Sequence, residues 1–153
     1  MFKGTVVSLY IAPAAEAEMQ MIEEPHAVPG LGLEGDRYFQ QTGTFSKPQP
    51  DRELTLIESE AIEAFRSELG LEVDTGFSRR NIVTRDVPLN HLVGREFLIG
   101  EVRVRGLKLC EPCKHLARVS RPEVLPGLVH RGGLRAQILT EGTIRAGAVV
   151  SDG

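Results

Sequence analysis

The fold is decided by the stretch Glu96-Phe97-Leu98-Ile99-Gly100-Glu101-Val102-Arg103-Val104-Arg105. Apolar residues on both sides of Gly100-Glu101 indicate two short strands that are joined by a tight turn. In the second strand, two valines alternate with two arginines, which is typical of a strand with one face in the core and the other in water. The stretch therefore predicts a β-hairpin.

Further strands are indicated on both sides of this hairpin. Leu107 and Leu109 continue its second strand as far as the cysteines that follow. The other expected strands are Thr5–Ile11, Asn81–Thr84 and Leu134–Leu139. Leu134–Leu139, the Glu141-Gly142 turn and the segment from Thr143-Ile144 towards Val149-Val150 together indicate a closing hairpin. Many short strands joined by glycine-rich turns predict a mainly β fold, a closed or half-closed β-barrel with a few short helices (α+β).

One helix is expected between Ile57 and Gly70, where apolar residues recur at helical spacing and the glycine is a plausible C-cap. Before it, the segment Pro29–Arg37 has glycines at alternate positions, which predicts a shaped loop, not a helix and not a nucleotide-binding turn. The segment Thr42–Asp51 is predicted to be an exposed connection that carries glycine and prolines.

The length and charge of the chain limit its class. With 153 residues, 41% hydrophobic and 25% charged, the chain is predicted to form a single domain over residues 1–153. Its net charge of -3 gives no general attraction to nucleic acid or to anionic lipid. Pro13 interrupts the first apolar run early, so we expect neither a signal peptide nor a membrane helix. Two closely spaced cysteines suit a reducing compartment, which indicates a cytoplasmic protein.

These cysteines, Cys110 and Cys113, enclose Glu111-Pro112 and are the only two in the chain. Four interpretations are open. The pair supplies half of a zinc site that His115 and His130 could complete, but this spacing is unconvincing. A thioredoxin-like redox pair needs a following helix, and we expect none because Arg121-Pro122 disfavours one. The third is a pair of small buried hydrophobes.

The fourth interpretation is a reactive thiolate on an exposed loop at a strand end. Glu111, Pro112 and Lys114 favour exposure of this loop. The cationic neighbours Lys114, His115 and Arg118 favour an ionised sulfur, which is the better nucleophile or metal ligand. We favour this interpretation of the pair.

A second group of candidate residues surrounds the cysteines in the sequence. The run His130-Arg131-Gly132-Gly133-Leu134-Arg135 combines consecutive glycines, whose N–H groups can form an anion-binding nest, with flanking guanidinium groups. Arg79-Arg80-Asn81 and Asp36-Arg37 place further polar groups at the ends of expected elements. Together with the thiols, they predict a local anion site in an otherwise acidic chain.

Six motifs occur in the order that is found in MOSC domains, named for the C-terminal part of the molybdenum cofactor sulfurase. The chain resembles a small stand-alone member of this family. The motifs are Gly35-Asp36-Arg37, Leu54-Thr55-Leu56-Ile57-Glu58, Arg80-Asn81-Ile82-Val83-Thr84, Leu92-Val93-Gly94-Arg95-Glu96-Phe97, Cys110-Glu111-Pro112-Cys113 and Arg131-Gly132-Gly133-Leu134-Arg135-Ala136.

The resemblance implies a β-rich barrel and a cysteine that carries sulfur or meets the molybdenum of a pterin cofactor. Cys113 stands at the family's cysteine position and is the implied nucleophile or metal ligand; Cys110 would resolve a persulfide as a disulfide. The implied pocket residues for the molybdenum cofactor are Arg37, Arg80, Asn81, His130, Arg131, Gly132, Gly133 and Arg135.

The leading hypothesis is therefore a sulfur carrier or molybdenum-cofactor-binding protein. One alternative is a molybdenum-dependent reductase of N-hydroxylated compounds, and another is a non-catalytic binding module. The sequence shows no pyridoxal-phosphate-dependent desulfurase segment and no ferredoxin or flavin domain. We therefore expect partners: a cysteine desulfurase or another sulfur donor, or electron-transfer proteins, besides a small anionic cofactor or substrate.

Overall fold

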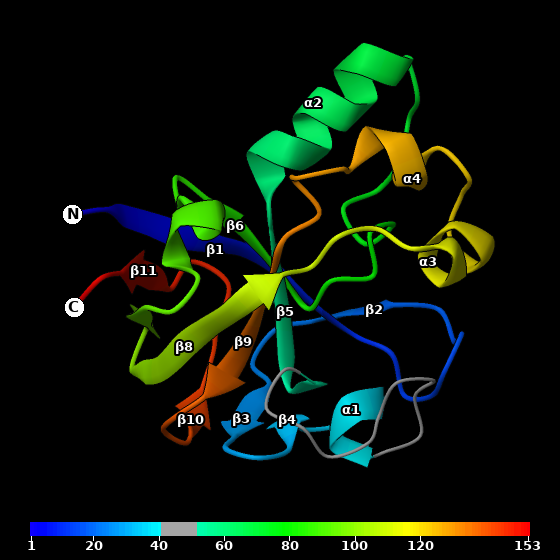
Figure 1. Ribbon diagram of the computed structural model, residues 1–153. Coiled ribbons are helices and arrows are strands. Elements are labelled where there is room, and N and C mark those ends of the chain that lie inside the picture. Colours follow the sequence, from blue (N-terminus) through cyan, green and yellow to red (C-terminus); the bar gives the residue numbers. More distant parts are fainter. Residues whose placement is uncertain (41–51) are drawn as a thin grey trace.

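The computed structural model describes residues 1–40 and 52–153, and its centre is a β-barrel (Figure 1). Within the described residues, seven strands form a closed ring, and β2 (Gln20–Ile22) is added at the edge of β1. In ring order these strands are β11 (Val149–Ser151), β7 (Glu96–Ile99), β8 (Val102–Leu109), β9 (Leu134–Ile138), β5 (Leu54–Glu58), β6 (Ile82–Arg85) and β1 (Lys3–Ile11).

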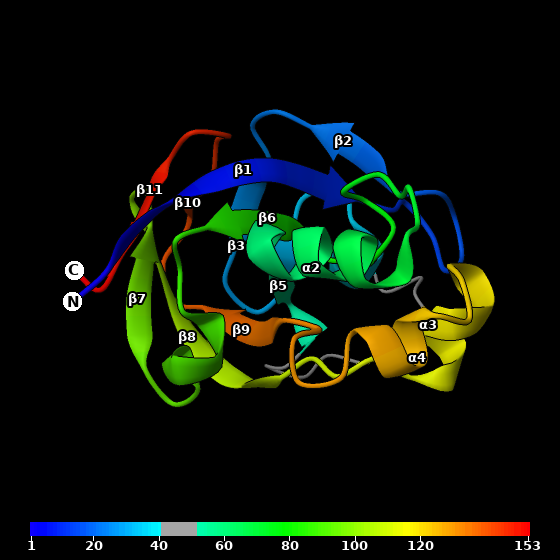
Figure 2. The same cartoon turned by 90° about the horizontal axis from the view of Figure 1, so that it is seen from above.

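The last strand closes the ring, because it pairs with strands on both sides. Val150 of β11 lies opposite Ile99 of β7 and also opposite Gly4 of β1. Both chain ends therefore lie side by side at one end of the barrel (Figure 2). Neighbouring strands in the ring run antiparallel except β5 and β6, which are parallel. A parallel pair needs a crossover, and α2 (Ser59–Leu69) lies in it.

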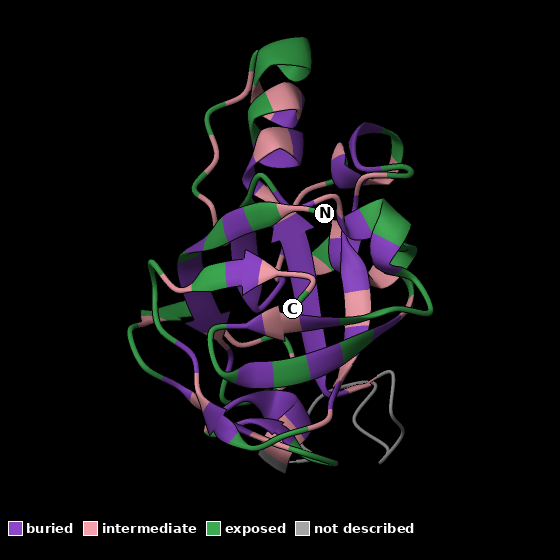
Figure 3. Cartoon of the chain, turned by 90° about the vertical axis from the view of Figure 1, so that its left-hand side faces the viewer, coloured by how far each residue is buried: buried purple, intermediate pink, exposed green. Residues whose placement is uncertain are grey.

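Alternating strand residues fill the barrel. Val102 and Val104 of β8 are fully buried, whereas Arg103 and Arg105 are exposed, as the sequence predicts. The same alternation appears as purple and green bands on the strands in Figure 3. The buried apolar residues of the strands pack with Phe97 in a single core cluster. Burial of these side chains supplies the main driving force for folding, about 1.5–3 kcal/mol for each large one.

A second apolar cluster joins the helices to one end of the barrel. α2 packs Ile62 and Phe65 against α3 (Lys114–Val119) and α4 (Val124–Gly127), which contribute Leu116 and Val124. These three helices gather at the same end in Figures 1 and 2. The remaining elements are a small sheet in the order β10 (Gly142–Thr143), β3 (His26–Val28) and β4 (Gly32–Leu33), the short helix α1 (Arg37–Gln40) and the 3-10 helix η2 (Leu89–Leu92).

The mainly β barrel with a few short helices is confirmed, but some local expectations are wrong. The helix begins at Ser59, because Ile57 belongs to β5; its predicted C-cap, Gly70, does adopt a left-handed conformation. The expected closing hairpin of Leu134–Leu139 with the segment after Gly142 does not form. β9 pairs with β8 and β5, whereas β10 pairs with β3, and β11 pairs with β7 and β1.

The glycine-rich segment 29–37 is a shaped turn, as predicted, since each of its glycines has a positive φ. It also contains β4, and it leads directly into α1, where a loop without a helix was expected. The predicted connection at Thr42–Asp51 lies outside the described residues. Among the helices that the structure describes, none is both long and apolar enough to cross a membrane.

Gly133 provides a test of strand packing. A Cβ at this position would overlap the carbonyl oxygen of Leu56, and its φ of 113° disfavours any side chain. We expect Gly133→Ala to lower the free energy of unfolding by about 2–5 kcal/mol through overpacking and backbone strain. Gly147 is the matched control, because its φ is also positive at 87° but a Cβ there would meet open space.

We expect Gly147→Ala to cost only about 1–2 kcal/mol, from the backbone alone. Urea denaturation followed by circular dichroism measures both values. If both variants lose the same free energy of unfolding, the close approach of Gly133 to Leu56 does not contribute to the loss.

Candidate functional site

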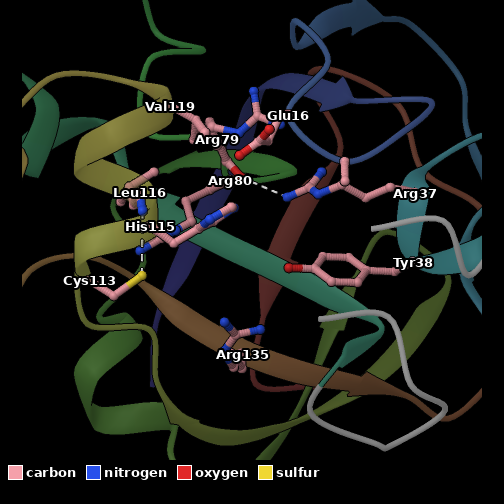
Figure 4. A pocket seen from close by; sticks show the side chains of 11 residues that line it. Glu16, Arg37, Tyr38, Arg79, Arg80, Cys113, His115, Leu116, Val119 and Arg135 are labelled. Carbon is pink, nitrogen blue, oxygen red and sulfur yellow. Dashed lines mark hydrogen bonds between the residues drawn. The ribbon is translucent and has the colours of Figure 1, made fainter. Parts of the chain in front are cut away.

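The candidate site is a pocket between α1 and α3, above β5 and β9 (Figure 4). It has a volume of about 480 Å³, counting the part that is open to solvent. The residues that line it are Ala15, Glu16, Arg37, Tyr38, Arg79, Arg80, Cys113, His115, Leu116, Val119 and Arg135.

Cys113 opens onto this pocket from the start of α3. Its thiol is free and the residue is exposed. The residue is the N-cap of α3, and its Sγ accepts a hydrogen bond from the backbone N–H of Leu116 at 3.5 Å. The predicted exposed thiol at a strand end is therefore present at Cys113.

The expectation that no helix follows Cys113 was wrong. α3 fits its six residues between Cys113 and Ser120, so it ends before Arg121-Pro122, where the proline restriction begins. A proline limits only the residue before it, and the segment is long enough for more than one turn. The region around the cysteines still differs from a thioredoxin-like unit, because Cys110 and Cys113 follow a strand of the barrel.

Cys110 has a different environment, although it lies only three residues away. It is 2% exposed and is absent from the pocket lining. Its N–H donates to the carbonyl of Gly133 at 2.7 Å, which continues the pairing of β8 with β9. The interpretation as a small buried hydrophobe thus describes Cys110, and the exposed-loop interpretation describes Cys113. A role for Cys110 in resolving a persulfide stays a prediction.

Arg80 holds the cysteine loop in place. Arg80 is only 6% exposed. Its guanidinium donates to the carbonyl oxygens of Gly132 at 2.7 Å, Cys110 at 2.8 Å and Ser78 at 3.3 Å. Its hydrogen-bonding groups are therefore engaged with backbone, although the side chain forms part of the pocket wall. We infer that Arg80 shapes the site more than it binds a ligand.

Arg37 reaches the pocket from α1 and is fixed by the buried Asp36. The two side chains form an ion pair at 3.2 Å, and Asp36 also accepts from the N–H groups of Ala12 and Tyr38. The Arg37 guanidinium lies 4.6 Å from the centre of the Tyr38 ring, a cation-π contact. The predicted placement of Arg37 at the end of the glycine-rich turn therefore brings a cation to the pocket.

Arg79 is a pocket residue that the sequence drew attention to only through its neighbour Arg80. It has a positive φ of 60°, an unusual conformation for a residue other than glycine. Its NH1 donates to the carbonyl of Ala17 at 2.7 Å, and within residues 1–40 and 52–153 it forms no ion pair. Burial lowers the pKa of Arg79, and repulsion from Arg37 lowers it further. Two guanidinium groups are thus held close together.

Tyr38 is the pocket residue that sequence analysis missed. Its hydroxyl points into the pocket in Figure 4. The residue is 8% exposed, and its hydroxyl has no hydrogen-bond partner among the described residues. Nothing in the sequence distinguishes this tyrosine from a core aromatic; its position directly after the Asp36-Arg37 pair is the only signal that could have identified it.

The other predicted residues are divided between scaffold and a separate surface. Arg135 lines the pocket from β9. Asn81 is fully buried and supports the barrel: its Oδ1 accepts from Thr55, and its Nδ2 donates to the carbonyl of Tyr10. Gly132 lies against the carbonyl oxygen of Cys110 and the side chain of Pro112, and a Cβ on Gly132 would clash with them. Asn81, Gly132 and Gly133 therefore position the site and do not line the pocket.

The structure does not bring His130 and Arg131 to this pocket. They line another one, together with Glu58 and His91. His130 pairs with Glu111 at 2.9 Å, and Arg131 pairs with Glu68. Burial raises the pKa of Glu58 in that second pocket, while the N–H of Leu89 opposes the shift.

The zinc interpretation of the cysteine pair has no complete ligand set. His115 lines the pocket with Cys113, but His130 is bonded to Glu111 and Cys110 is buried. Among the residues that the structure describes, no three His, Cys, Asp or Glu side chains come close enough together to hold a metal ion.

A model of the MOSC domain matches residues 40–151. The chain belongs to the MOSC domain family. This confirms the resemblance that the six motifs gave, and it makes the protein a member of a family that is associated with the molybdenum cofactor. The match begins at Gln40, the last residue of α1, so Arg37 and Tyr38 lie just outside it. No curated protein matches the chain.

Solved structures share this MOSC fold over almost the whole chain. The YuaD protein from Bacillus subtilis is 13% identical with a TM-score of 0.80, and the alignment covers 98% of this chain and 97% of that one. YiiM from Geobacillus stearothermophilus is 14% identical with a TM-score of 0.75, over 97% and 74% of the two chains. YiiM from Escherichia coli is 19% identical with a TM-score of 0.68, over 96% and 68%.

Arg80 gives a test of how the site is held. We expect Arg80→Met to lower the free energy of unfolding by about 2–4 kcal/mol, because it leaves buried carbonyls without donors. It should also expose Cys110 to alkylation under native conditions. Mass spectrometry of the alkylated peptide, together with urea denaturation, measures both effects.

Arg85→Met is the matched control, since Arg85 is exposed and pairs with Glu63 at the surface. We expect it to change stability by no more than about 0.5 kcal/mol and to leave Cys110 protected. If Cys110 in Arg80→Met reacts as slowly as in the unaltered protein, Arg80 does not hold the loop.

Proposed function

We propose that this MOSC protein uses the Cys113 thiolate either to carry a sulfane sulfur as a persulfide or to bind the molybdenum of the pterin cofactor. The observation that carries the proposal is that the exposed thiol opens onto the same pocket as three arginines, Arg37, Arg79 and Arg135. A nucleophilic sulfur and several cations in one cavity suit chemistry on an anionic molecule.

The Cys113 sulfur has polar and cationic neighbours. The N–H of Leu116 donates to Sγ, and arginines line the same pocket. A persulfide is an anion and would be stabilised by these groups. The contrast with the buried Cys110 supports Cys113 as the reactive member of the pair.

The residues of the pocket fit the molybdenum cofactor in their chemistry. Molybdopterin carries a phosphate, which Arg37, Arg79 and Arg135 would hold, and the hydroxyl of Tyr38 would donate to an oxygen of the bound group. Cys113 would supply a soft thiolate ligand. When bound, the cofactor would supply two-electron redox chemistry at molybdenum.

Either form of the proposal requires another protein. A persulfide on Cys113 needs a sulfur source, for which a cysteine desulfurase, itself pyridoxal-phosphate-dependent, is the proposed donor. A reductase of N-hydroxylated compounds, the alternative function, needs external electron-transfer proteins. A third pocket, different from the one that His130 and Arg131 line, shares Arg79 and Val119 with the Cys113 pocket and would give room for such a substrate.

The test of sulfur carriage uses the whole protein, a cysteine desulfurase and cysteine. We expect mass spectrometry to find one additional sulfur on Cys113, and none after Cys113→Ser. Cys110→Ser should still be loaded, since Cys110 is absent from the pocket lining; a longer-lived persulfide in that variant would show that Cys110 resolves it.

The test of cofactor binding is elemental analysis of protein from a host that makes the molybdenum cofactor. Bound molybdenum that is lost in Cys113→Ser would support ligation and the reductase alternative. Neither added sulfur nor retained molybdenum, together with slow alkylation of Cys113, would contradict the proposal and favour a non-catalytic binding module.

A further inference from the structure

Among the described residues, the Cys113 pocket contains a guanidinium without an ion-pair partner and a hydroxyl without a hydrogen-bond partner. Arg37 shares its charge with Asp36, and Arg80 is engaged by backbone carbonyls. Arg79, in contrast, has no carboxylate partner in the described part of the chain, and burial together with Arg37 lowers its pKa. Tyr38 as a residue is 8% exposed, and its hydroxyl, which has no hydrogen-bond partner among the described residues, points into the pocket.

Nearby negative charge offsets the burial and repulsion of these groups only in part. Glu16, the acidic residue in the described lining, is exposed and paired with Arg118, and Glu16 and Asp36 raise the pKa of Arg79 by less than burial and Arg37 lower it. Keeping two guanidinium groups together in a partly buried place costs free energy, which a bound anion would recover. The geometry therefore favours a small anion with oxygen atoms beside the Cys113 thiol.

We propose that this pocket accepts sulfur directly from a small sulfur oxyanion with a terminal sulfane sulfur, the class to which thiosulfate belongs. This inference rests on the proposed persulfide function of Cys113 and names a donor that is not a protein. A phosphate or carboxylate would meet the same arginines but has no sulfur to transfer. Thiosulfate meets both the cations and the nucleophile.

The transfer is balanced without any oxidant. The Cys113 thiolate attacks the outer sulfur of thiosulfate, and a new S–S bond forms on the protein as the S–S bond of thiosulfate breaks. The bonding pair leaves with sulfite, so a thiolate and a thiosulfate dianion become a persulfide anion and a sulfite dianion. An acceptor thiolate or cyanide then attacks the outer persulfide sulfur and regenerates the Cys113 thiolate.

The pocket residues have distinct roles in this step. Attack of an anion on a dianion is opposed by Coulomb repulsion, which Arg79 and Arg37 reduce. The Tyr38 hydroxyl donates to a sulfite oxygen as negative charge builds up on the leaving group. Tyr38 and Arg79 are thus assigned to the anion, and Cys113 to the transferred sulfur.

The experiment incubates the whole protein with sodium thiosulfate and measures sulfite release, with peptide mass spectrometry of Cys113. We expect sulfite and a persulfide on Cys113 in equal amounts, and thiocyanate formation when cyanide is added. Cys113→Ser should abolish both products. Arg79→Gln should lower kcat/KM for thiosulfate by about tenfold to a hundredfold, mainly through KM, and Tyr38→Phe by about tenfold, mainly through kcat.

The control removes a guanidinium elsewhere. Arg95→Gln takes away an exposed guanidinium on the barrel surface and should keep the rate of the unaltered protein. Loading from a cysteine desulfurase should survive in Arg79→Gln and Tyr38→Phe, which shows that these variants fold and that Cys113 remains reactive.

The outcomes separate this inference from the proposed function. If a desulfurase loads Cys113 but thiosulfate releases no sulfite, the inference is wrong and sulfur carriage stands. Equal rates in Arg79→Gln and Arg95→Gln would also overturn it. If neither donor loads Cys113, the persulfide function fails as well.

Discussion

The arrangement of the site depends on one buried guanidinium. Arg80 stands just before β6 and holds the carbonyl oxygens of Cys110, after β8, and of Gly132, before β9. A buried cation is tolerated only where polar partners replace its hydration. These three segments must therefore meet in one place, and the close packing of Gly132 and Gly133 allows them to do so. Cys113, three residues beyond Cys110, is positioned as a result.

The same constraint separates two cysteines that look equivalent in the sequence. Cys110 belongs to the β8–β9 pairing and is covered, whereas Cys113 begins a helix at the rim of a pocket. The chain carries a net charge of -3, yet this pocket collects arginines from α1, from the segment before β6 and from β9. Local concentration of cations thus overrides the overall charge, which is how an acidic protein can hold an anion.

Much of the fold could be predicted from local patterns. The alternation of valine and arginine in β8 fixed both the strand and its buried face, because side chains in a strand point to opposite sides in turn. Pairing partners could not be predicted in the same way. Val149–Ser151 looks like half of a hairpin but pairs with β1 and β7, since closing a barrel joins residues far apart in sequence. Likewise, α3 depends on Leu116 packing in the cluster with Phe65, and local signals alone did not predict it.

The sequence by itself determined the family, the β-rich class and the two sulfurs at the end of a strand, because these follow from residue types and their order along the chain. Tertiary structure decided which sulfur faces a ligand, which arginines accompany it and that Tyr38 joins them. It also placed His130 and Arg131 in a different pocket, where they pair with Glu111 and Glu68. The physical reason is that a pocket forms where separate segments converge, and that convergence is set by long-range strand pairing and packing.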